Sequence, residues 1–245
     1  MPGPVTSPLS ALIFDVDGTL AETEEMHRHA FNAAFKAADL DWHWTSALYR
    51  ELLTTAGGKE RIRAFIRDHA GSPAPGSERI DLLHADKTRR YGEMIARGNI
   101  ALRAGIADLI TQAQATGLRL AVATTTSRSN VDALVFATLR QHAAHVFDVI
   151  AAGDEVARKK PAPDVYNLAL ERLGLPPDRT LALEDSRNGL LSAHGAGIAC
   201  IVSPGPYTVG QDFTLACAVV DTFANLRLSD WQLPDTHSAR TMQWQ

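Results

Sequence analysis

The segment at positions 11–19, Ala-Leu-Ile-Phe-Asp-Val-Asp-Gly-Thr, constrains the fold of this chain more than any other stretch. Its first four residues are apolar and typical of a buried strand, and Gly18 marks a turn beyond its end. Asp15 and Asp17 follow the strand so closely that they repel each other, and burying them unpaired is costly. A hard cation such as Mg²⁺ relieves that cost, because it takes oxygen ligands and keeps positions open for phosphate oxygens.

Two other interpretations of this segment were weighed. A strand followed by an acidic turn is common and needs no ligand. A calcium loop is the second, because Asp15, Asp17, Gly18 and Glu24 fall in the register of an EF-hand. That register puts Ile13 where the first carboxylate belongs, and a strand precedes the loop instead of a helix. The calcium interpretation is therefore rejected.

Composition excludes several classes of protein. The 245 residues are 45% hydrophobic and 21% charged, enough to bury a full core in one domain or two. A net charge of −4 does not suggest a nucleic-acid-binding surface, and no apolar run reaches the roughly 18 residues needed to span a membrane. The first ten residues read as a loose leader and not as a signal peptide. We expect a cytoplasmic monomer in which Cys200 and Cys217 are reduced core residues.

Hydrophobic periodicity alternates between helix and strand from about residue 100 onward. Strands are expected at 118–124, within the apolar stretch 146–152, at 180–183 and at 198–202, with a further short strand beginning at Val219. Helical patterns lie between them. Such alternation predicts an α/β fold built on a doubly wound parallel sheet that is covered on both faces.

The segment from about residue 25 to 95 shows helical patterns and no convincing strand, and the run 71–77 reads as a loop between helices. It interrupts the sheet after the first strand, so we expect an inserted helical cap domain at 25–95. The α/β core then comprises 1–24 and 96–230, and 231–245 forms a C-terminal tail.

Polar residues follow each expected strand. Asp15 follows the first, the run Thr124-Thr125-Thr126-Ser127 ends the second, and Glu184-Asp185 ends the fourth; Lys160-Pro161 precedes a helix. Active sites of open parallel sheets lie at the carboxyl ends of their strands, so these groups are expected to converge. Each alone is a weak signal.

Together, in this order, they resemble the four motifs of the haloacid dehalogenase-like phosphatases, and the helical insert occupies the position of that family's cap. The resemblance covers about residues 10–225. Within the family, the segments ETEEMHRHAF, LLTTAGGKERI, VATTTSRSNV and KKPAPD are most similar to the CbbY-type xylulose-1,5-bisphosphate phosphatases of the Calvin cycle. The β-phosphoglucomutases are the next most similar group, although they carry Val where this chain has Thr19.

The resemblance implies a mechanism. Asp15 is the nucleophile that forms an aspartyl-phosphate, and Asp17 is the general acid and base. Mg²⁺ is held by Asp15, by the backbone carbonyl of Asp17 and by Asp185, with Glu184 as a further ligand or a supporting group. Mg²⁺ and the lysine together offset most of the negative charge of the carboxylates and a phosphate dianion.

The assignments at the phosphate leave alternatives open. Lys160 is chosen over its neighbour Lys159 by resemblance alone, because the family's lysine directly precedes the proline. Thr124 is the preferred phosphate-binding hydroxyl, with Thr125 a second candidate that is otherwise a structural strand-end residue. Glu184 and Asp185 also suit a helix N-terminus, where the dipole favours acids.

The cap is expected to select the substrate. Glycine-flanked amides at the start of a helix form an anion site, and this one is no Walker loop because Leu53 and Glu60 occupy the Gly and Ser/Thr positions. Surface charges that bind nothing are the alternative. The substrate-binding candidates are Glu24, His27, Gly57, Gly58, Lys59, Glu60, Arg61, His84 and Lys87 from the cap side, and Thr126, Ser127, Arg128 and Asn130 from the core.

The function expected from the resemblance is Mg²⁺-dependent hydrolysis of a sugar bisphosphate, with xylulose-1,5-bisphosphate as the named candidate. The alternatives are a phosphosugar mutase and a non-enzymatic phosphosugar sensor. A mutase requires the aspartyl-phosphate to outlast the exchange of its bisphosphate intermediate. The sensor fits poorly with a chain that has kept Asp15, Asp17, Lys160 and Asp185.

Overall fold

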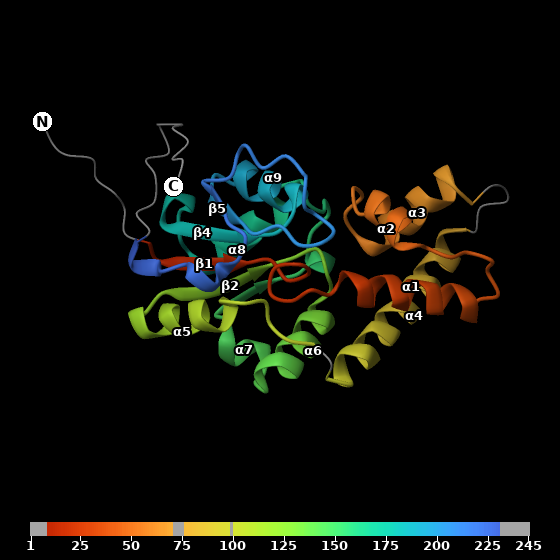
Figure 1. The fold of residues 1–245 in the computed structure, drawn as a ribbon, viewed down its shortest axis with the longest axis horizontal. Coiled ribbons are helices and arrows are strands. Elements are labelled where there is room, and N and C mark those ends of the chain that lie inside the picture. The colour runs from red at the N-terminus through yellow and green to blue at the C-terminus, as the bar shows by residue number, and fades with distance from the viewer. Residues whose placement is uncertain (1–8, 71–75, 99, 231–245) are drawn as a thin grey trace, which may run out of the picture.

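Strand β1 (Ala11–Phe14) lies inside a six-stranded parallel sheet in the computed structural model, which describes residues 9–70, 76–98 and 100–230. The strand order is β3-β2-β1-β4-β5-β6, and Figure 1 labels the four strands β2, β1, β4 and β5. The other strands are β2 (Arg119–Ala123), β3 (Val149–Ala151), β4 (Thr180–Glu184), β5 (Ala199–Val202) and β6 (Ala218–Val219). The chain winds outward from β1 to β3 and then restarts on the other side at β4, which is the doubly wound arrangement. The predicted fold class is confirmed.

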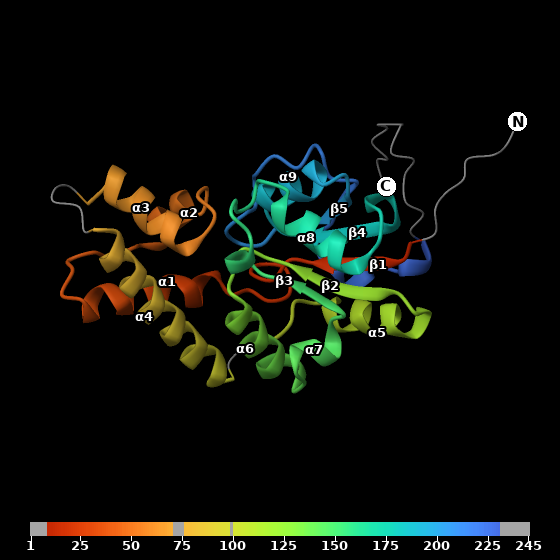
Figure 2. The same ribbon diagram turned by 180° about the vertical axis from the view of Figure 1, so that it is seen from behind.

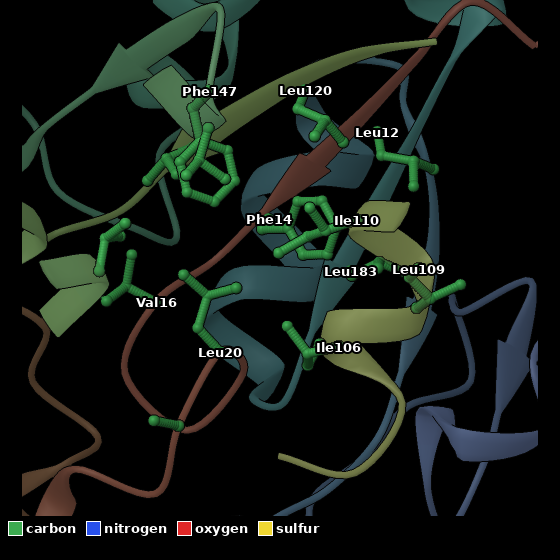
Figure 3. Packing of buried hydrophobic residues seen from close by; sticks show 14 of the residues in the cluster. Leu12, Phe14, Val16, Leu20, Ile106, Leu109, Ile110, Leu120, Phe147 and Leu183 are labelled. Atoms are coloured by element: carbon green, nitrogen blue, oxygen red, sulfur yellow. The ribbon is translucent and has the colours of Figure 1, made fainter. Parts of the chain in front are cut away.

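Helices cover both faces of the sheet. Leu12 and Phe14 of β1 pack into one core, formed with α5 (Ile106–Thr116), α6 (Arg128–Leu139) and α7 (Ala143–Val146). Figure 3 shows Phe14 of this core beside Ile110 of α5. Ala11 and Ile13 pack into a second core with α8 (Asp164–Leu173) and α9 (Arg187–Gly195). Burial on both faces explains why β1 is continuously apolar instead of alternating.

Local sequence signals set the helix ends on the sheet side. Gly105 and Gly117 flank α5 with positive φ angles of 90° and 72°, which suit glycine. The side chain of Ser186 caps α9 by accepting a hydrogen bond from the amide of Gly189. Short 3₁₀ turns lie at Gly153–Glu155, Pro177–Arg179, Phe223–Asn225 and Leu228–Asp230.

Four helices follow β1 and gather at one end of the molecule, beside the sheet (Figures 1 and 2). They are α1 (Glu24–Ala37), α2 (Ser46–Leu52), α3 (Gly58–Asp68) and α4 (Ser77–Ala96), and we call residues 24–96 the helical segment. Phe31, Phe35 and Phe65 of these helices form an aromatic core with Trp44 from the connection before α2. The segment therefore has apolar packing of its own, and it also contributes Ala30, Tyr91 and Ile95 to the first core at the sheet.

The structure differs from the sequence analysis in a few places. Helix α2 was not predicted as a separate element. The apolar stretch 146–152 is divided, because Val146 ends α7 and the strand begins at Val149, while β6 starts one residue before its predicted position. The expected leader and tail fall at 1–8 and 231–245, and most of the 71–77 loop at 71–75, outside the described residues. Among the described residues, no helix combines the length and apolar character that crossing a bilayer requires.

Candidate active site

The carboxyl ends of β1, β2 and β4 bring the sequence-predicted groups to one edge of the sheet. The amide of Asp15 donates to the carbonyl of Leu183 at 3.0 Å, so Asp15 extends the pairing of β1 with β4. Glu184 is the last residue of β4, and Asp185 is the next in the chain. Lys160 reaches the same place from the turn before α8. Parallel strands in register therefore place these acids and the lysine together.

The ammonium of Lys160 lies between two carboxylates. Its Nζ donates to Oδ1 of Asp15 and to Oε1 of Glu184, each at 2.6 Å. All three side chains are buried. Burial alone would lower the pKa of Lys160, but the two carboxylate charges outweigh it and hold that pKa above its ordinary value. Lys160 therefore stays cationic, whereas the ammonium of Lys159 donates to the carbonyls of Gly153 and Val156.

Glu184 is held from behind by a residue that the sequence analysis did not find. The hydroxyl of Tyr166 on α8 donates to Oε1 of Glu184 at 2.6 Å, and the ring centroid lies 5.2 Å from Nζ of Lys160. A Cβ at Gly189 would lie 1.8 Å from Oε2 of Glu184, so α9 can approach this carboxylate only with a glycine. Oε2 itself is buried and has no hydrogen-bond partner among the described residues.

The acids at this edge suit a divalent cation. Asp15, Glu184 and Asp185 each offer a ligand atom, and these atoms lie within 4.8 Å of one another. Burial raises the pKa of Asp15 to about 7 despite the opposing charge of Lys160, and burial with the charges of Asp15 and Glu184 raises that of Asp185 well above its ordinary value. A hard cation bound by carboxylate oxygens of Asp15 and Asp185 would relieve this repulsion, so the donor set fits Mg²⁺.

Asp17 receives two hydrogen bonds on the same oxygen. The hydroxyl of Thr23 donates to Oδ1 at 2.6 Å, and Nε2 of His27 lies 2.9 Å from Oδ1. Burial alone would raise the pKa of Asp17, but the interaction with His27 and both hydrogen bonds hold it well below its ordinary value. Among the described residues no hydrogen bond falls on Oδ2, which is left to meet a substrate. Thr23 is a second residue that the sequence analysis missed.

A buried lysine lies behind His27. Nζ of Lys87, on α4, is 2.7 Å from Nδ1 of His27, and the ring of Tyr91 stacks on the imidazole at 3.9 Å. Burial lowers the pKa of Lys87 to about 8, and burial together with the charge of Lys87 lowers the pKa of His27. The imidazole is therefore neutral near pH 7. Lys87 was expected to face a ligand; it lines the cavity described below, but its ammonium is engaged by His27.

The helical segment supplies further cations and polar groups. Lys59 at the start of α3 pairs with Asp81 at 2.7 Å on the surface. Arg61 donates to the hydroxyl of Tyr49, which in turn donates to Glu24 at 2.8 Å. His84 lies against Gly58, where a Cβ would meet its Nε2 at 2.4 Å. Burial and nearby lysines lower the pKa of His84 to about 4, so it is neutral near pH 7.

The residues at the sheet edge and those of the helical segment face one cavity of about 780 Å³ that lies between them. Most of the predicted site residues line it: Asp15, Asp17, Glu24, His27, Gly57, Gly58, Lys59, Glu60, Arg61, His84, Lys87, Thr125, Thr126, Ser127, Asn130, Lys160 and Asp185. The sequence analysis did not select the cavity residues Asp154, Lys159, Ser186, Arg187, Asn188, Thr208 and Gln211. Spacing within the chain gave no signal for them, because they sit on loops, on the 3₁₀ turn Gly153–Glu155 and at the first residues of α9.

Three predicted site residues lie elsewhere. The hydroxyl of Thr124 is buried and accepts a hydrogen bond from the amide of Thr126 at 3.2 Å, and Thr124 is not among the residues that line the cavity. Arg128 points along α6 to Asp132 at 3.3 Å. Glu184 is fully buried behind Lys160 and does not line the cavity. The surface at the end of β2 is formed by Thr125 and Thr126 instead of the preferred Thr124.

Comparison with known proteins places the chain in a family. The model of the haloacid dehalogenase-like hydrolases matches residues 12–203. Protein CbbY of Cereibacter sphaeroides is 57% identical over 89% of this chain and 94% of its own, and protein CbbY of Rhodobacter capsulatus is 55% identical over 95% and 96%.

A solved structure agrees with these relatives. The CbbY mutant from Rhodobacter sphaeroides in complex with xylulose-(1,5)bisphosphate superposes with a TM-score of 0.86 at 57% identity, covering 89% of this chain and 96% of the other. The chain therefore belongs to the haloacid dehalogenase-like hydrolases, among which it is a phosphatase similar to the CbbY proteins.

Proposed function

We propose that the protein hydrolyses one phosphate ester of a sugar bisphosphate and that this substrate is xylulose-1,5-bisphosphate. The observation that supports this most is that one cavity has two differently built sides. Buried acids and Lys160 line the sheet edge, and Lys59, Arg61 and the amides of Gly57 and Gly58 line the helical segment. The similarity to the CbbY structure that holds xylulose-(1,5)bisphosphate supports the choice of sugar.

The reaction proceeds in two displacements at phosphorus. A carboxylate oxygen of Asp15 attacks the phosphoryl group, the bond from phosphorus to the sugar oxygen breaks, and Asp17 gives that oxygen a proton. Water then attacks the aspartyl-phosphate and passes a proton to Asp17, which releases inorganic phosphate and restores the Asp15 carboxylate. The hydrogen bonds to Oδ1 of Asp17 leave Oδ2 to exchange the proton; because they also favour the ionised carboxylate, they suit the step in which Asp17 accepts a proton from water.

Mg²⁺ is the proposed cofactor. Asp15 and Asp185 would hold it, together with the backbone carbonyl of Asp17, and Glu184 supports the site through Lys160. When bound, it supplies positive charge that makes the approach of a carboxylate to a phosphate dianion tolerable. Lys160 contributes a fixed positive charge beside Asp15 throughout, and Thr125 and Thr126 offer hydroxyls to the phosphoryl oxygens.

We propose that residues 25–95 act as a cap over a core formed by 1–24 and 96–230. A phosphate bound on the cap side does not react, yet cap closure over it excludes water and aligns the scissile group. Binding energy from that remote phosphate should then appear in kcat as well as in KM. The aromatic core of the helical segment supports its movement as a unit, with Ala30, Tyr91 and Ile95, which pack against the core at the sheet, on the side about which it turns.

A phosphate-release screen tests the proposal. The wild-type protein with Mg²⁺ is given xylulose-1,5-bisphosphate, ribulose-1,5-bisphosphate, glucose-1,6-bisphosphate and the corresponding monophosphates, and the sugar products are identified by mass and by chromatography. The proposal expects inorganic phosphate and an unrearranged sugar monophosphate from a bisphosphate. Isomerised sugar without net phosphate release identifies a mutase, and no Mg²⁺-dependent turnover of any ester identifies a sensor; either outcome contradicts the proposal.

A further inference from the structure

The segment 203–212, which follows β5 and which we call the closing loop, touches both sides of the cavity. Its tip reaches the helical segment through Tyr207. The hydroxyl of Tyr207 donates to the carboxylate of Glu25 on α1, and its ring meets the ring of Tyr49 on α2 edge to face, with centroids 5.7 Å apart at 86°. One side chain of the sheet side thus contacts two helices of the helical segment.

Arg50 of α2 adds a contact in the opposite direction. Its guanidinium donates to the carbonyl of Pro206 at 3.0 Å and lies 5.6 Å from the centroid of the Tyr207 ring. A guanidinium over an aromatic face is attractive, and an edge-to-face aromatic pair adds to it. The contacts at the tip therefore involve hydrogen bonds and ring contacts from three residues of the helical segment.

The base of the closing loop is fixed to the sheet side by Arg103. This guanidinium donates to the carbonyls of Ser203 and Pro204, at 2.8 and 3.2 Å, and to the carbonyl of Gly18 beside Asp17. The guanidinium suits this role because it carries several N–H donors in one rigid plane. The loop consequently cannot follow the helical segment as a whole, and a movement of that segment must be absorbed at the tip.

Thr208, adjacent to Tyr207, reaches a candidate metal ligand. Its single hydroxyl proton lies within reach of Oδ2 of Asp185 at 3.3 Å and of the carbonyl of Gly205 at 3.4 Å, and its oxygen accepts from the amide of Gly205 at 2.9 Å. Thr208 is buried, and Gly205 ties it to the fixed base of the loop. Consecutive residues of one loop therefore contact the helical segment and the carboxylate of Asp185.

We infer that Tyr207 is a positioning residue that latches the helical segment closed and, through Thr208, couples closure to the orientation of Asp185. This rests on the proposed function, since it assigns a role in that same reaction. With the segment closed, Tyr207 is held by Glu25, Tyr49 and Arg50, and Thr208 is held on Asp185. When the segment opens, Tyr207 loses these partners, and Thr208 is then positioned on Asp185 only by its bonds to Gly205 at the base of the loop. The latch shifts an existing equilibrium between closed and open forms.

The first test compares Tyr207→Ala with Val209→Ala, a matched control on the same loop whose side chain is 71% exposed. Loss of the aromatic, cation and hydrogen-bond contacts should lower the closed-to-open ratio by about tenfold. We expect small-angle scattering of the Mg²⁺-loaded protein to show a larger radius of gyration for Tyr207→Ala only. In the same variant kcat/KM for xylulose-1,5-bisphosphate should fall by about tenfold, and that for p-nitrophenyl phosphate should fall less.

A second pair of variants keeps the test informative if Tyr207→Ala folds poorly. Arg50→Gln removes contacts from the helical side without altering the loop, and it should open the molecule in the same direction. Tyr207→Phe keeps the ring contacts and loses only the bond to Glu25, so its effect should be smaller. Calorimetric titration of Mg²⁺ should show weaker binding in Thr208→Val and, in the same direction, in Tyr207→Ala.

The inference is overturned if Tyr207→Ala and Arg50→Gln match Val209→Ala in radius of gyration and in Mg²⁺ affinity. Both readouts are made without substrate. They therefore separate a failure of the latch from a failure of the proposed function, in which the wild-type protein would release no phosphate from a bisphosphate.

Discussion

The ammonium of Lys87 donates a hydrogen bond to Nδ1 of His27 at 2.7 Å, although the two residues lie on different helices, α4 and α1. An ammonium has no acceptor, so Nδ1 must accept and the proton of the neutral imidazole must sit on Nε2. That proton points at Oδ1 of Asp17, 2.9 Å away. A lysine of the helical segment thus fixes the tautomer of the histidine that orients the proposed general acid and base.

Lys87→Met should therefore lower kcat by about 10- to 100-fold, because His27 is released to either tautomer and no longer reliably donates to Asp17. The loss should be similar for a bisphosphate and for p-nitrophenyl phosphate, since it acts through Asp17. Steady-state kinetics on both substrates measure it, with the exposed Lys36→Met on α1 as the control. A loss confined to bisphosphates would instead make Lys87 a direct phosphate ligand.

Asp15→Asn should abolish turnover while the fold persists. The amide has nearly the shape of the carboxylate but is a far weaker nucleophile, so a loss of about 10⁴-fold or more is expected. Phosphate release and the circular dichroism spectrum are the two measurements. Hydrolysis within tenfold of the wild type would remove Asp15 from the role of nucleophile.

Lys59→Ala should impair bisphosphates selectively. A charge-assisted hydrogen bond to phosphate is worth about 1.5–3 kcal/mol, which corresponds to roughly 10- to 100-fold in kcat/KM. Monophosphates and p-nitrophenyl phosphate should be nearly unaffected, because they leave the cap side of the cavity empty. Arg67→Ala, an exposed residue at the other end of α3, is the matched control. Equal losses on both substrate types would show that the helical segment does not bind a second phosphate.

Tyr166→Phe should destabilise the fold by about 1–3 kcal/mol, because Glu184 loses a donor in a fully buried site. Tyr91→Phe is a stringent control: that hydroxyl is also buried, but it meets no hydrogen-bond partner among the described residues. Urea unfolding at pH 7.5 should separate the two variants. If both unfold at the same urea concentration, the bond from Tyr166 to Glu184 contributes no net stability.

His84 should make the protein sensitive to acid. Its folded pKa of about 4 lies below the ordinary 6.5, so the unfolded chain binds more protons between these values. Stability is therefore unaffected by this group above pH 6.5 and falls as the pH drops toward 4. At pH 5 the loss is about 2 kcal/mol, and His84→Gln should abolish it. Urea unfolding at pH 7.5 and 5.0 measures the free energy of unfolding at both values. If His84→Gln loses as much stability between them as the wild type does, the prediction is wrong. The exposed His142→Gln, as a control, should lose as much as the wild type.

The fold could be predicted from sequence because its signals are local. Four apolar residues before Asp15 require burial on both faces, and the alternation of periods after residue 100 requires crossovers between parallel strands. Strand boundaries were less certain near Val146, because a one-turn helix and a strand share the same apolar composition. The short helix α2 carries only two buried residues, Tyr49 and Leu52, which is too few to establish a period.

The groups around the site were harder to predict because their partners are distant along the chain. Asp15 and Lys160 were found through motifs whose order is informative, whereas Tyr166 is an ordinary aromatic residue of an amphipathic helix until Glu184 is placed beside it. Tyr207 meets Glu25 across 182 positions. Lys87 was expected to lie on the cap and to bind substrate, but only the structure reveals that it is buried against His27.

The pairing of Glu22 with Arg103 has a consequence for how such proteins diversify. The chain enters the helical segment just after Glu22 and returns just before Arg103, and the two side chains meet at 3.0 Å. One ion pair on the sheet side thus joins the two points where the chain enters and leaves the helical segment. Recombination that exchanges the insert between these two positions leaves Asp15, Asp17, Lys160 and Asp185 in place, so new specificities can arise by shuffling one contiguous piece of gene. The new insert must again supply partners for Asp17 such as Thr23 and His27, and the acceptor scaffold must keep this arginine and this glutamate.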